Sequence, residues 1–330
     1  MRPVALLTTL LLLTLASLLF SLATGSVAIS WQDLLAAFQG TGSDNDLAGQ
    51  VVMELRWPRT VAAFITGALL ALAGGLMQVL LRNPLADPYV LGVSGGAATG
   101  ALLAMLAGLG SVWLHGAAFS GALLSMLLVF GLSHGSGSWT TSRLLLTGIV
   151  IAAGWGAIIG LLLAISPEQG LRGMLFWLMG DLSGATFPGS GFPVLMIGLA
   201  AAMGIGRSLN ILAHGEQTAG ALGVSVRPLR YFIYLLASLL TATAVTLAGS
   251  IGFVGLIVPH MLRLLGVRDH RLLLPAATLL GGSLLVVADT LARTLLAPRQ
   301  LPVGILTALV GVPVFLMLLH HSRALHGEAR

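Results

Sequence analysis

The chain has 330 residues, of which 57% are apolar and 8% are charged, and a soluble domain of this composition is excluded because it would expose large apolar patches. It contains no cysteine and no lysine, which excludes disulfides, a cysteine nucleophile and the lysine-dependent phosphate loop of ATPases. The formal net charge of +5 comes from arginines in short loops between apolar runs, which favours a role in membrane topology over nucleic-acid binding.

The apolar residues form about ten runs that are long enough to cross a bilayer as helices. None shows the alternating pattern of a membrane β-barrel. The expected spans are 4–24, 60–81, 91–109, 113–132, 143–165, 191–206, 231–250, 252–266, 273–296 and 304–320. We therefore predict an all-α polytopic membrane protein with about ten transmembrane helices. No linker long enough to separate two domains interrupts them, so residues 1–330 are expected to form a single transmembrane domain.

The first run, after Arg2, has two interpretations. Small residues near its end could form the cleavage site of a signal peptide. The run is about 20 residues long, which exceeds the apolar region of most signal peptides and matches a transmembrane span. We expect a retained first span.

Arginine placement predicts the orientation of these spans. With the N-terminus inside, eleven arginines are cytoplasmic: Arg2, Arg82, Arg143, Arg207, Arg227, Arg230, Arg263, Arg268, Arg271, Arg323 and Arg330. Five are outside: Arg56, Arg59, Arg172, Arg293 and Arg299. This bias predicts that both termini are cytoplasmic, and that 207–230 is the only sizeable cytoplasmic loop.

Several spans carry small residues at four-residue spacing, which forms a smooth stripe along one helix face. The stripes are Gly67, Ala71 and Gly75; Gly92, Gly96 and Gly100; and Gly148, Ala152, Gly156 and Gly160. Such stripes favour close helix packing, and lining of a translocation path is the alternative reading for each.

The loop at 82–88 contains two prolines that cannot continue either neighbouring helix. It is either a rigid connector or a gate in which Asn83 and Leu85 close a pathway. In the gate hypothesis, Thr141 and Ser142 of the next cytoplasmic loop are its polar neighbours.

Ordered motifs along most of the chain resemble one transporter family. They include Arg56, Pro58 and Arg59 before the second span, Gln78 within it, Asn83 to Pro88, and Leu91 to Ser94. Further blocks are GSIGFVGLIVPHMLR at 249–263, LLPAATLLGGSLLVVADTLAR at 273–293 and LPVGILTALVGVPVFLMLL at 301–319. These blocks resemble the permease subunits of ABC importers for iron–siderophore complexes, haem and vitamin B12, the FecCD or BtuC-like family. Gln300 departs from the glutamate that the family often has there.

The resemblance implies a BtuC-like (type II ABC importer) fold and a homodimer in the bacterial inner membrane. The transport pathway would follow the two-fold axis, flanked chiefly by the fifth, eighth and tenth spans. The implied partners are two ATP-binding cassette ATPase subunits and a periplasmic substrate-binding protein. The chain would carry no cofactor and catalyse nothing, since the partner hydrolyses ATP. The expected cargo is a metal chelate, with iron–siderophore first and haem or cobalamin next.

The same resemblance assigns the loop at 207–230 to coupling with the ATPase. Gly215 and Gly223 are natural helix stops, and Glu216 suits the start of a short second helix. The alternative is a loop that only links two spans, which would be shorter and more polar. The predicted coupling residues are Leu209, Asn210, Gly215, Glu216, Ala219, Leu222 and Gly223.

Arg56, Arg59 and Arg293 lie outside, against the charge bias. In the family, such arginines form ion pairs with glutamates of the substrate-binding protein. All three are therefore predicted to bind that protein. The alternative for Arg56 and Arg59 is snorkelling to the interface. For Arg293 the alternative is an ion pair with Asp289, four residues earlier on the same helix face.

Two other functions are compatible with parts of the sequence. An ion-coupled secondary transporter needs charged residues within the membrane, and Asp289 is the only clear candidate. An intramembrane serine protease is suggested by Gly92 to Gly95, with His260 as a base, but this short motif is common in glycine-rich sequence. His260 is expected to be a satisfied structural histidine, and no metal site is predicted at His320, His321 and His326.

Overall fold

The computed structural model describes residues 3–25, 29–39, 47–133, 140–185 and 188–327, and every regular element within these ranges is helical. Two short segments are not α-helical: the π-helix η1 (Val51–Arg56) and the 3₁₀ turn η2 (Pro88–Leu91). The α-helices are α1 (Pro3–Ala23), α2 (Trp31–Gln39), α3 (Leu47–Gln50), α4 (Trp57–Leu80), α5 (Val93–Leu106), α6 (Ser111–Ser133), α7 (Thr141–Ile165), α8 (Glu168–Leu178), α9 (Gly191–Gly204), α10 (Gly206–Leu212), α11 (Glu216–Ala221), α12 (Val226–Ala248), α13 (Val254–Leu264), α14 (His270–Thr294) and α15 (Val303–Gly327).

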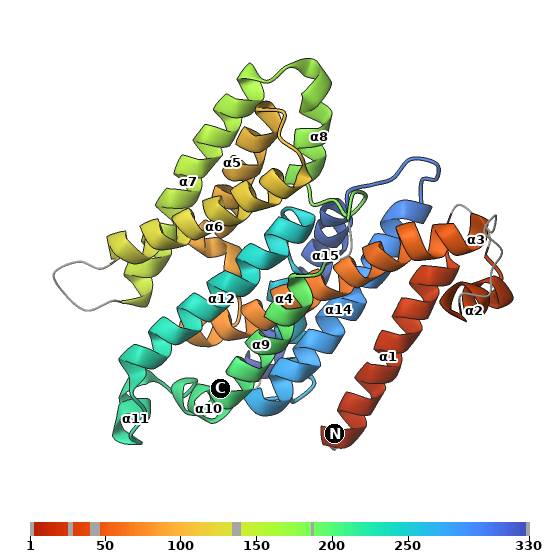
Figure 1. Ribbon diagram of the computed structural model, residues 1–330. Helices are drawn as coiled ribbons and strands as arrows, with labels where there is room; N and C mark the ends of the chain where they lie inside the picture. The colour runs from red at the N-terminus through yellow and green to blue at the C-terminus, as the bar shows by residue number, and fades with distance from the viewer. Residues whose placement is uncertain (1–2, 26–28, 40–46, 134–139, 186–187, 328–330) are drawn as a thin grey trace.

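Helix α4 is the centre of the fold and is almost entirely buried (Figure 1). It packs most extensively against α14 and α12, with α13 on a further side. Glycine permits this approach, because a Cβ on Gly67 would overlap the carbonyl oxygen of Gly281 and a Cβ on Gly74 would overlap that of Gly255. The first small-residue stripe therefore lies at a helix contact through Gly67, and Ala71 lies there as well, because a Cβ on Gly281 would overlap its side chain.

Helices α5, α6 and α7 form a second group beside this centre, with α8 against α5 (Figure 1). A Cβ on Gly96 would overlap the carbonyl oxygen of Gly121, and one on Gly100 would overlap that of Ala117. The second stripe is thus also a packing surface. In the third stripe, a Cβ on Gly156 or Gly160 would meet nothing within 4 Å, so this part of α7 faces away from the rest of the chain.

The described residues contain helices at all ten expected span positions, but they do not confirm ten full spans. Six segments are long and apolar enough to cross a membrane, and α9 with α10 forms a seventh if a pair bent by 59° counts as one span. Three more helices are apolar but shorter than a full span: α5, α13 and the apolar part of α15. Two of these short helices follow segments without α-helix, at 81–92 (which contains η2) before α5 and at 249–253 before α13.

The two ends of the helix bundle carry different elements. The start of α1 lies at the same end as α10 and α11, which we call the α11 end (Figure 1). The short helices α2, α3 and α8 lie at the opposite end, which we call the α8 end (Figure 1). This alternation agrees with the predicted order of loops along the chain.

Candidate functional site

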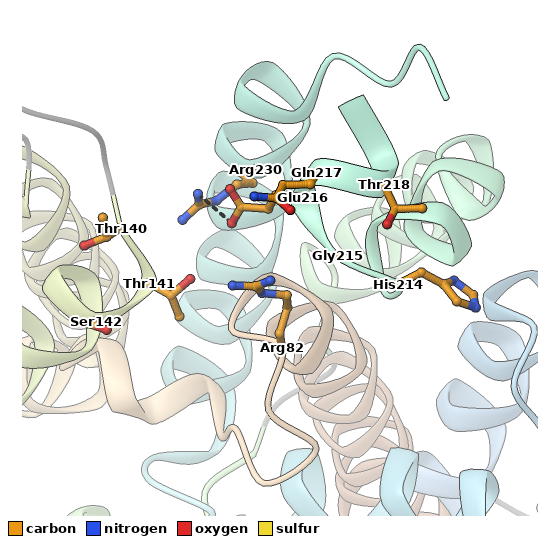
Figure 2. Close-up of a pocket in the computed structure, with 10 residues that line it drawn as sticks. All are labelled: Arg82, Thr140, Thr141, Ser142, His214, Gly215, Glu216, Gln217, Thr218 and Arg230. Carbon is orange, nitrogen blue, oxygen red and sulfur yellow. Dashed lines mark ion pairs between the residues drawn. The ribbon is translucent and has the colours of Figure 1, made fainter. Parts of the chain in front are cut away.

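A cavity with a volume of about 660 Å³ lies at the α11 end. It is formed where the start of α7, the end of α4 and the segment around α11 meet (Figure 2). Its lining residues are Arg82, Thr140, Thr141, Ser142, His214, Gly215, Glu216, Gln217, Thr218 and Arg230. The cavity therefore joins the predicted gate neighbours to the predicted coupling segment.

The coupling side of this cavity depends on Gly215. Its backbone has φ of 117° and ψ of 154°, a conformation that residues with a Cβ rarely adopt, so glycine is required between α10 and α11. Glu216 then begins α11 and forms an ion pair with Arg230 of α12 at 3.0 Å (Figure 2). This ion pair ties α11 to the long helix that follows it.

The segment 207–230 contains the two short helices, α10 and α11, that the sequence predicts. Its predicted coupling residues divide into two groups. Leu209 and Ala219 are fully buried in the core, so they anchor the segment from inside. Leu222 lies just after α11 and has 65% of its surface exposed. Among the predicted coupling residues, it is the large apolar side chain that is accessible to a partner protein.

Asn210 anchors the same segment to the start of α14. Its Nδ2 donates to Asp269 at 2.7 Å, and its Oδ1 accepts the His270 backbone N–H at 2.8 Å. Asn210 is therefore a structural link within the chain. Gly223, the remaining predicted residue, has a positive φ of 81° and ends the turn after α11.

The gate side of the cavity begins at the N-terminus of α7. Thr140 caps this helix by accepting the Arg143 backbone N–H at 3.3 Å, which places Thr141 and Ser142 in the first turn. The buried Thr141 Oγ1 has no hydrogen-bond partner in the described part of the chain. Figure 2 shows Thr141 and Arg82 pointing toward the space below the Glu216–Arg230 ion pair.

Two side-chain hydrogen bonds hold the backbone of the turn at 82–88. The Asn83 side chain accepts the Leu85 backbone N–H at 2.9 Å, and Asp87 accepts the Tyr89 backbone N–H at 2.8 Å to cap η2. Burial raises the pKa of Asp87 to about 6, and the Tyr89 hydrogen bond offsets part of this shift. Asn83 and Leu85 do not line the cavity; Arg82, at a positive φ of 47°, lines it instead.

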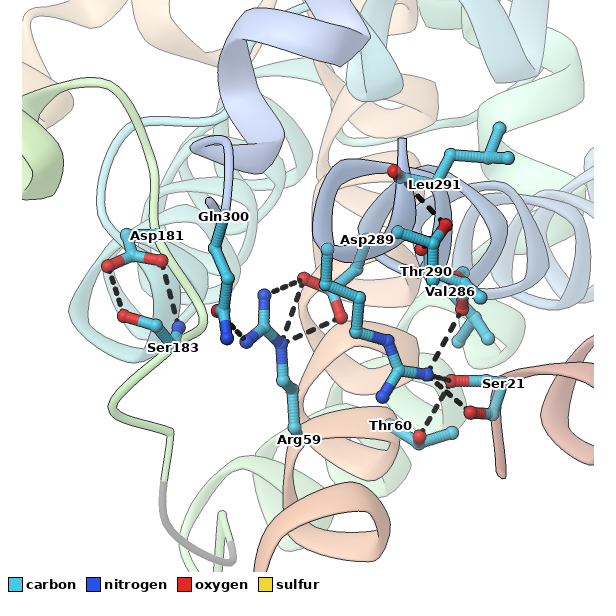
Figure 3. Close-up of polar contacts among 12 residues, drawn as sticks. Ser21, Arg59, Thr60, Asp181, Ser183, Val286, Asp289, Thr290, Leu291 and Gln300 are labelled. Carbon is cyan, nitrogen blue, oxygen red and sulfur yellow. Dashed lines mark hydrogen bonds and ion pairs between the residues drawn. The ribbon is translucent and has the colours of Figure 1, made fainter. Parts of the chain in front are cut away.

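At the α8 end, Arg59 and Asp289 form a buried bidentate ion pair. Arg59 Nη2 lies 2.8 Å from Asp289 Oδ1, and Arg59 Nε lies 2.9 Å from Oδ2. Arg59 Nη1 also donates to Gln300 Oε1 at 2.7 Å, so the unusual glutamine keeps a contact as a neutral acceptor (Figure 3). The alternative pairing of Arg293 with Asp289 is wrong, because in the described part of the chain Asp289 pairs with Arg59 and the hydrogen bonds of Arg293 go to Ser21 and Thr290.

The other two predicted docking arginines hold the end of α1. Arg56 is buried and donates to the carbonyl oxygens of Leu22 and Ala23, at 2.7 and 3.2 Å. Arg293 is half-buried and donates to the Ser21 hydroxyl at 2.7 Å and to the Ser21 carbonyl oxygen. All three arginines therefore gather at the α8 end, where they also have structural roles.

The histidines differ in how far the structure describes them. His260 is buried, as expected, but neither of its ring nitrogens has a hydrogen-bond partner among the described residues, so the expectation that it is satisfied is wrong there. The side chains of His321 and His326 lie outside the described residues. Within the described residues, no three His, Asp or Glu side chains are placed to hold a metal ion.

Sequence reasoning missed three residues of the α11 end. The charge bias explains Arg82 and Arg230 by topology alone, yet both line the large cavity. No sequence pattern marks His270, yet it is buried against Asn210. The sequence did place most arginines on the cytoplasmic side of the membrane. It did not indicate which of these arginines lie close together in the fold.

Comparison with known proteins places the chain in a family. The profile of the FecCD transport family matches residues 12–321. The chain is 41% identical to the hemin transport system permease protein HmuU of Yersinia pestis, over 93% of this chain and 94% of that protein. It is 38% identical to the vitamin B12 import system permease protein BtuC of Salmonella typhi, over 97% and 96%. A solved inward-facing ABC transporter of metal-chelate type superposes with a TM-score of 0.85 at 33% identity, covering 96% of this chain and 98% of that one. The chain belongs to the FecCD transport family, as a permease subunit of an ABC importer.

Proposed function

We propose that this chain works as a homodimer that moves a metal chelate across the bacterial inner membrane, driven by two separate ATPase subunits. The main support is the 660 Å³ cavity, which is lined both by the coupling residues Gly215 and Glu216 and by the gate neighbours Thr141 and Ser142. A movement of α11 imposed by an ATPase would change the shape of this space and would pass directly to α12 through the Glu216–Arg230 ion pair. The α11 end is then the cytoplasmic end, in agreement with the arginine bias.

The homodimer follows from the family resemblance, and the exposed apolar surface of α7 and α15 is compatible with it. In α7, Val150 and Leu161 have 68% and 61% of their surface exposed, and in α15, Leu309 and Met317 have 66% and 68% exposed. These are the fifth and tenth expected spans, the ones that a dimer with a central pathway would place at its axis. The open glycines of α7 would allow close approach there.

Docking of a periplasmic binding protein at the α8 end is supported most directly by Arg293. It is half-buried, and its hydrogen bonds go to the neutral groups of Ser21 and Thr290. A glutamate of a binding protein would add a charge that these partners do not supply. Arg56 and Arg59 are more deeply buried, so their contribution would come chiefly through the positive field of the cluster.

The cargo is proposed as a class. The family resemblance places iron–siderophore first, whereas the relatives from Yersinia pestis and Salmonella typhi are named for hemin and vitamin B12. All three are large chelates. We propose a metal chelate, with these three as the candidates to be tried.

The test is uptake into proteoliposomes that contain the permease with its cognate ATPase and binding protein. We expect uptake of one of the three chelates to require ATP on the ATPase side and to survive a protonophore. Uptake that continues without ATP and stops with the protonophore would contradict the proposal and favour a secondary transporter. The Arg59–Asp289 ion pair already argues against that alternative, because it occupies the one clear intramembrane candidate for ion coupling.

A further inference from the structure

A second, smaller cavity at the α11 end is lined by two arginines and by no carboxylate. Its volume is about 200 Å³, and it lies between the end of α4, the end of α13, the start of α14 and the link from α10 to α11. Its lining residues are Gln78, Val79, Arg82, Pro84, Ala213, Arg263 and His270. We call it the Arg263 cavity.

Arg263 is held at this cavity by a neutral group. Its Nη1 donates to Gln78 Oε1. The Gln78 amide nitrogen donates to the carbonyl oxygens of Gly255 and Leu256, at 3.4 and 3.1 Å, which fixes the amide oxygen toward Arg263. The guanidinium is half-buried, and it forms no ion pair within the described part of the chain. Its positive charge is therefore positioned but not balanced.

His270 adds a buried polar atom that lacks a partner. The residue has 4% of its surface exposed, and its Nε2 has no hydrogen-bond partner among the described residues. Its Nδ1 lies 2.7 Å from Asn210 Oδ1. Because Asn210 Nδ2 donates to Asp269, the amide oxygen faces His270 and must accept, so Nδ1 carries a proton. Nε2 is left to bond a ligand in the cavity, since leaving such an atom buried and unpaired costs free energy.

The nearby acidic side chain does not neutralise the cavity. Asp269 Oδ1 accepts from Asn210 Nδ2 at 2.7 Å and from the Arg271 backbone N–H at 2.9 Å. It is exposed and is not part of the cavity lining. Arg82, by contrast, is exposed on the turn after α4 and lines both this cavity and the larger one.

We propose that the Arg263 cavity binds a phosphate group through Arg263, Arg82 and His270. The arginines supply charged donors that match phosphate oxygens. Because the His270 proton is on Nδ1, Nε2 accepts, and its donor would be the hydroxyl of a hydrogen phosphate or of a polyol headgroup. The group could come from an anionic phospholipid headgroup or from free phosphate. Basic pockets between membrane helices at the cytoplasmic side suit the first source. Because Ala213 also lines the cavity, an occupant would brace the coupling segment against α4, α13 and α14.

The test uses the full-length permease alone, so its outcome is independent of the proposed transport function. Delipidated protein in detergent is titrated with inorganic phosphate, with chloride at equal ionic strength as reference. In a second arm it is titrated with phosphatidylglycerol, with phosphatidylcholine as reference. Bound phosphate or lipid is read by the shift in unfolding temperature and by native mass spectrometry.

The variants are Arg263→Gln and Arg82→Gln, with Arg268→Gln as the matched control. Arg268 is an exposed arginine of the same loop region and does not line the cavity. We expect the first two variants to weaken binding by about tenfold or more, because a charged hydrogen bond to phosphate is lost, and Arg268→Gln to leave it unchanged. If Arg263→Gln fails to fold, Arg82→Gln on the exposed turn still decides the result.

Saturable binding that Arg263→Gln or Arg82→Gln weakens and Arg268→Gln does not supports the proposal, and the arm that responds identifies the source. Saturable binding that neither cavity variant weakens would overturn it. No binding beyond the ionic-strength reference would overturn it. An equal loss in Arg268→Gln would overturn it as well, because the effect would then be general surface charge. If neither probe binds and Arg263→Gln instead weakens association with the ATPase, the partner of these arginines is a protein and the proposal is wrong.

Discussion

Arg59 of α4 and Asp289 of α14 form a buried bidentate ion pair across 230 residues of sequence. The pair joins the central helix to its most extensive neighbour near the α8 end. Removing one partner would leave an unbalanced buried charge, whereas removing both would leave an apolar contact.

We therefore expect Asp289→Asn to lower the free energy of unfolding by about 3–5 kcal/mol. The double variant Arg59→Met with Asp289→Leu should lose less than Asp289→Asn alone, because no buried charge remains. Unfolding of the purified permease in detergent measures both. If the double variant has a lower free energy of unfolding than Asp289→Asn, the ion pair stabilises the fold by more than the avoidance of an unbalanced buried charge.

Asp289→Asn is also the control for docking. Arg293→Gln removes a positive charge at the α8 end and leaves the Arg59–Asp289 pair intact, whereas Asp289→Asn breaks the pair and retains every arginine. We expect Arg293→Gln to weaken affinity for the binding protein by about tenfold at low salt, and Asp289→Asn to leave it unchanged or strengthen it. Equal losses in both variants would mean that the effect is structural and that Arg293 does not dock the partner.

The turn at 82–88 gives a test of the dimer axis. Leu85→Cys introduces the only cysteine of the chain, and the Asn83 side chain holds the turn that carries it. If these turns approach one another across the two-fold axis, an oxidant should produce a disulfide-linked dimer in at least one nucleotide state. Leu222→Cys, exposed beyond α11, is the control and should not cross-link two permeases. Failure of Leu85→Cys in every nucleotide state would place the turn away from the axis.

The raised pKa of Asp87 leads us to expect that the stability of the fold depends on pH. Its pKa rises from 3.8 to about 6 on folding because of burial, so the folded chain holds this proton more tightly than the unfolded chain. The contribution of the protonated Asp87 to stability is fully present below about pH 4 and is lost as the pH rises through about 6. Asp87→Asn should flatten this part of the profile, by on the order of 1–3 kcal/mol between its limits. An unchanged slope between about pH 4 and pH 7 in the variant would show that other groups cause it.

The sequence predicted the helices and helix breaks that depend only on residues close together in the chain. The apolar runs predicted the position of each long helix, and Gly215 with Glu216 predicted the break between α10 and α11. The partner of Asp289 could not be predicted this way. Helical spacing offers Arg293 on the same helix, and only the packing of α14 on α4 brings Arg59 closer.

The division of the coupling residues has a similar cause. Leu209, Ala219 and Leu222 are all small or apolar residues in short helical stretches, so their sequence gives no reason to separate them. Burial in the folded chain does so, since two are fully buried and Leu222 is exposed. The Arg263 cavity was also beyond sequence reasoning, because it assembles side chains from helix ends and turns that lie far apart in the sequence.

Coupling to a separate ATPase through the α10–α11 segment is the central claim, and Gly215→Pro tests it most directly. Proline fixes φ near −65° where the backbone requires 117°, so the link should distort while every membrane helix is left intact. Gly220→Ala, within α11, is the matched control because an added Cβ would meet nothing within 4 Å. The measurement is ATP hydrolysis by the permease–ATPase complex on addition of the loaded binding protein. We predict that Gly215→Pro inserts into the membrane but loses this stimulation, and that Gly220→Ala retains it. Stimulation of Gly215→Pro to the wild-type level would contradict the claim and place coupling on another surface.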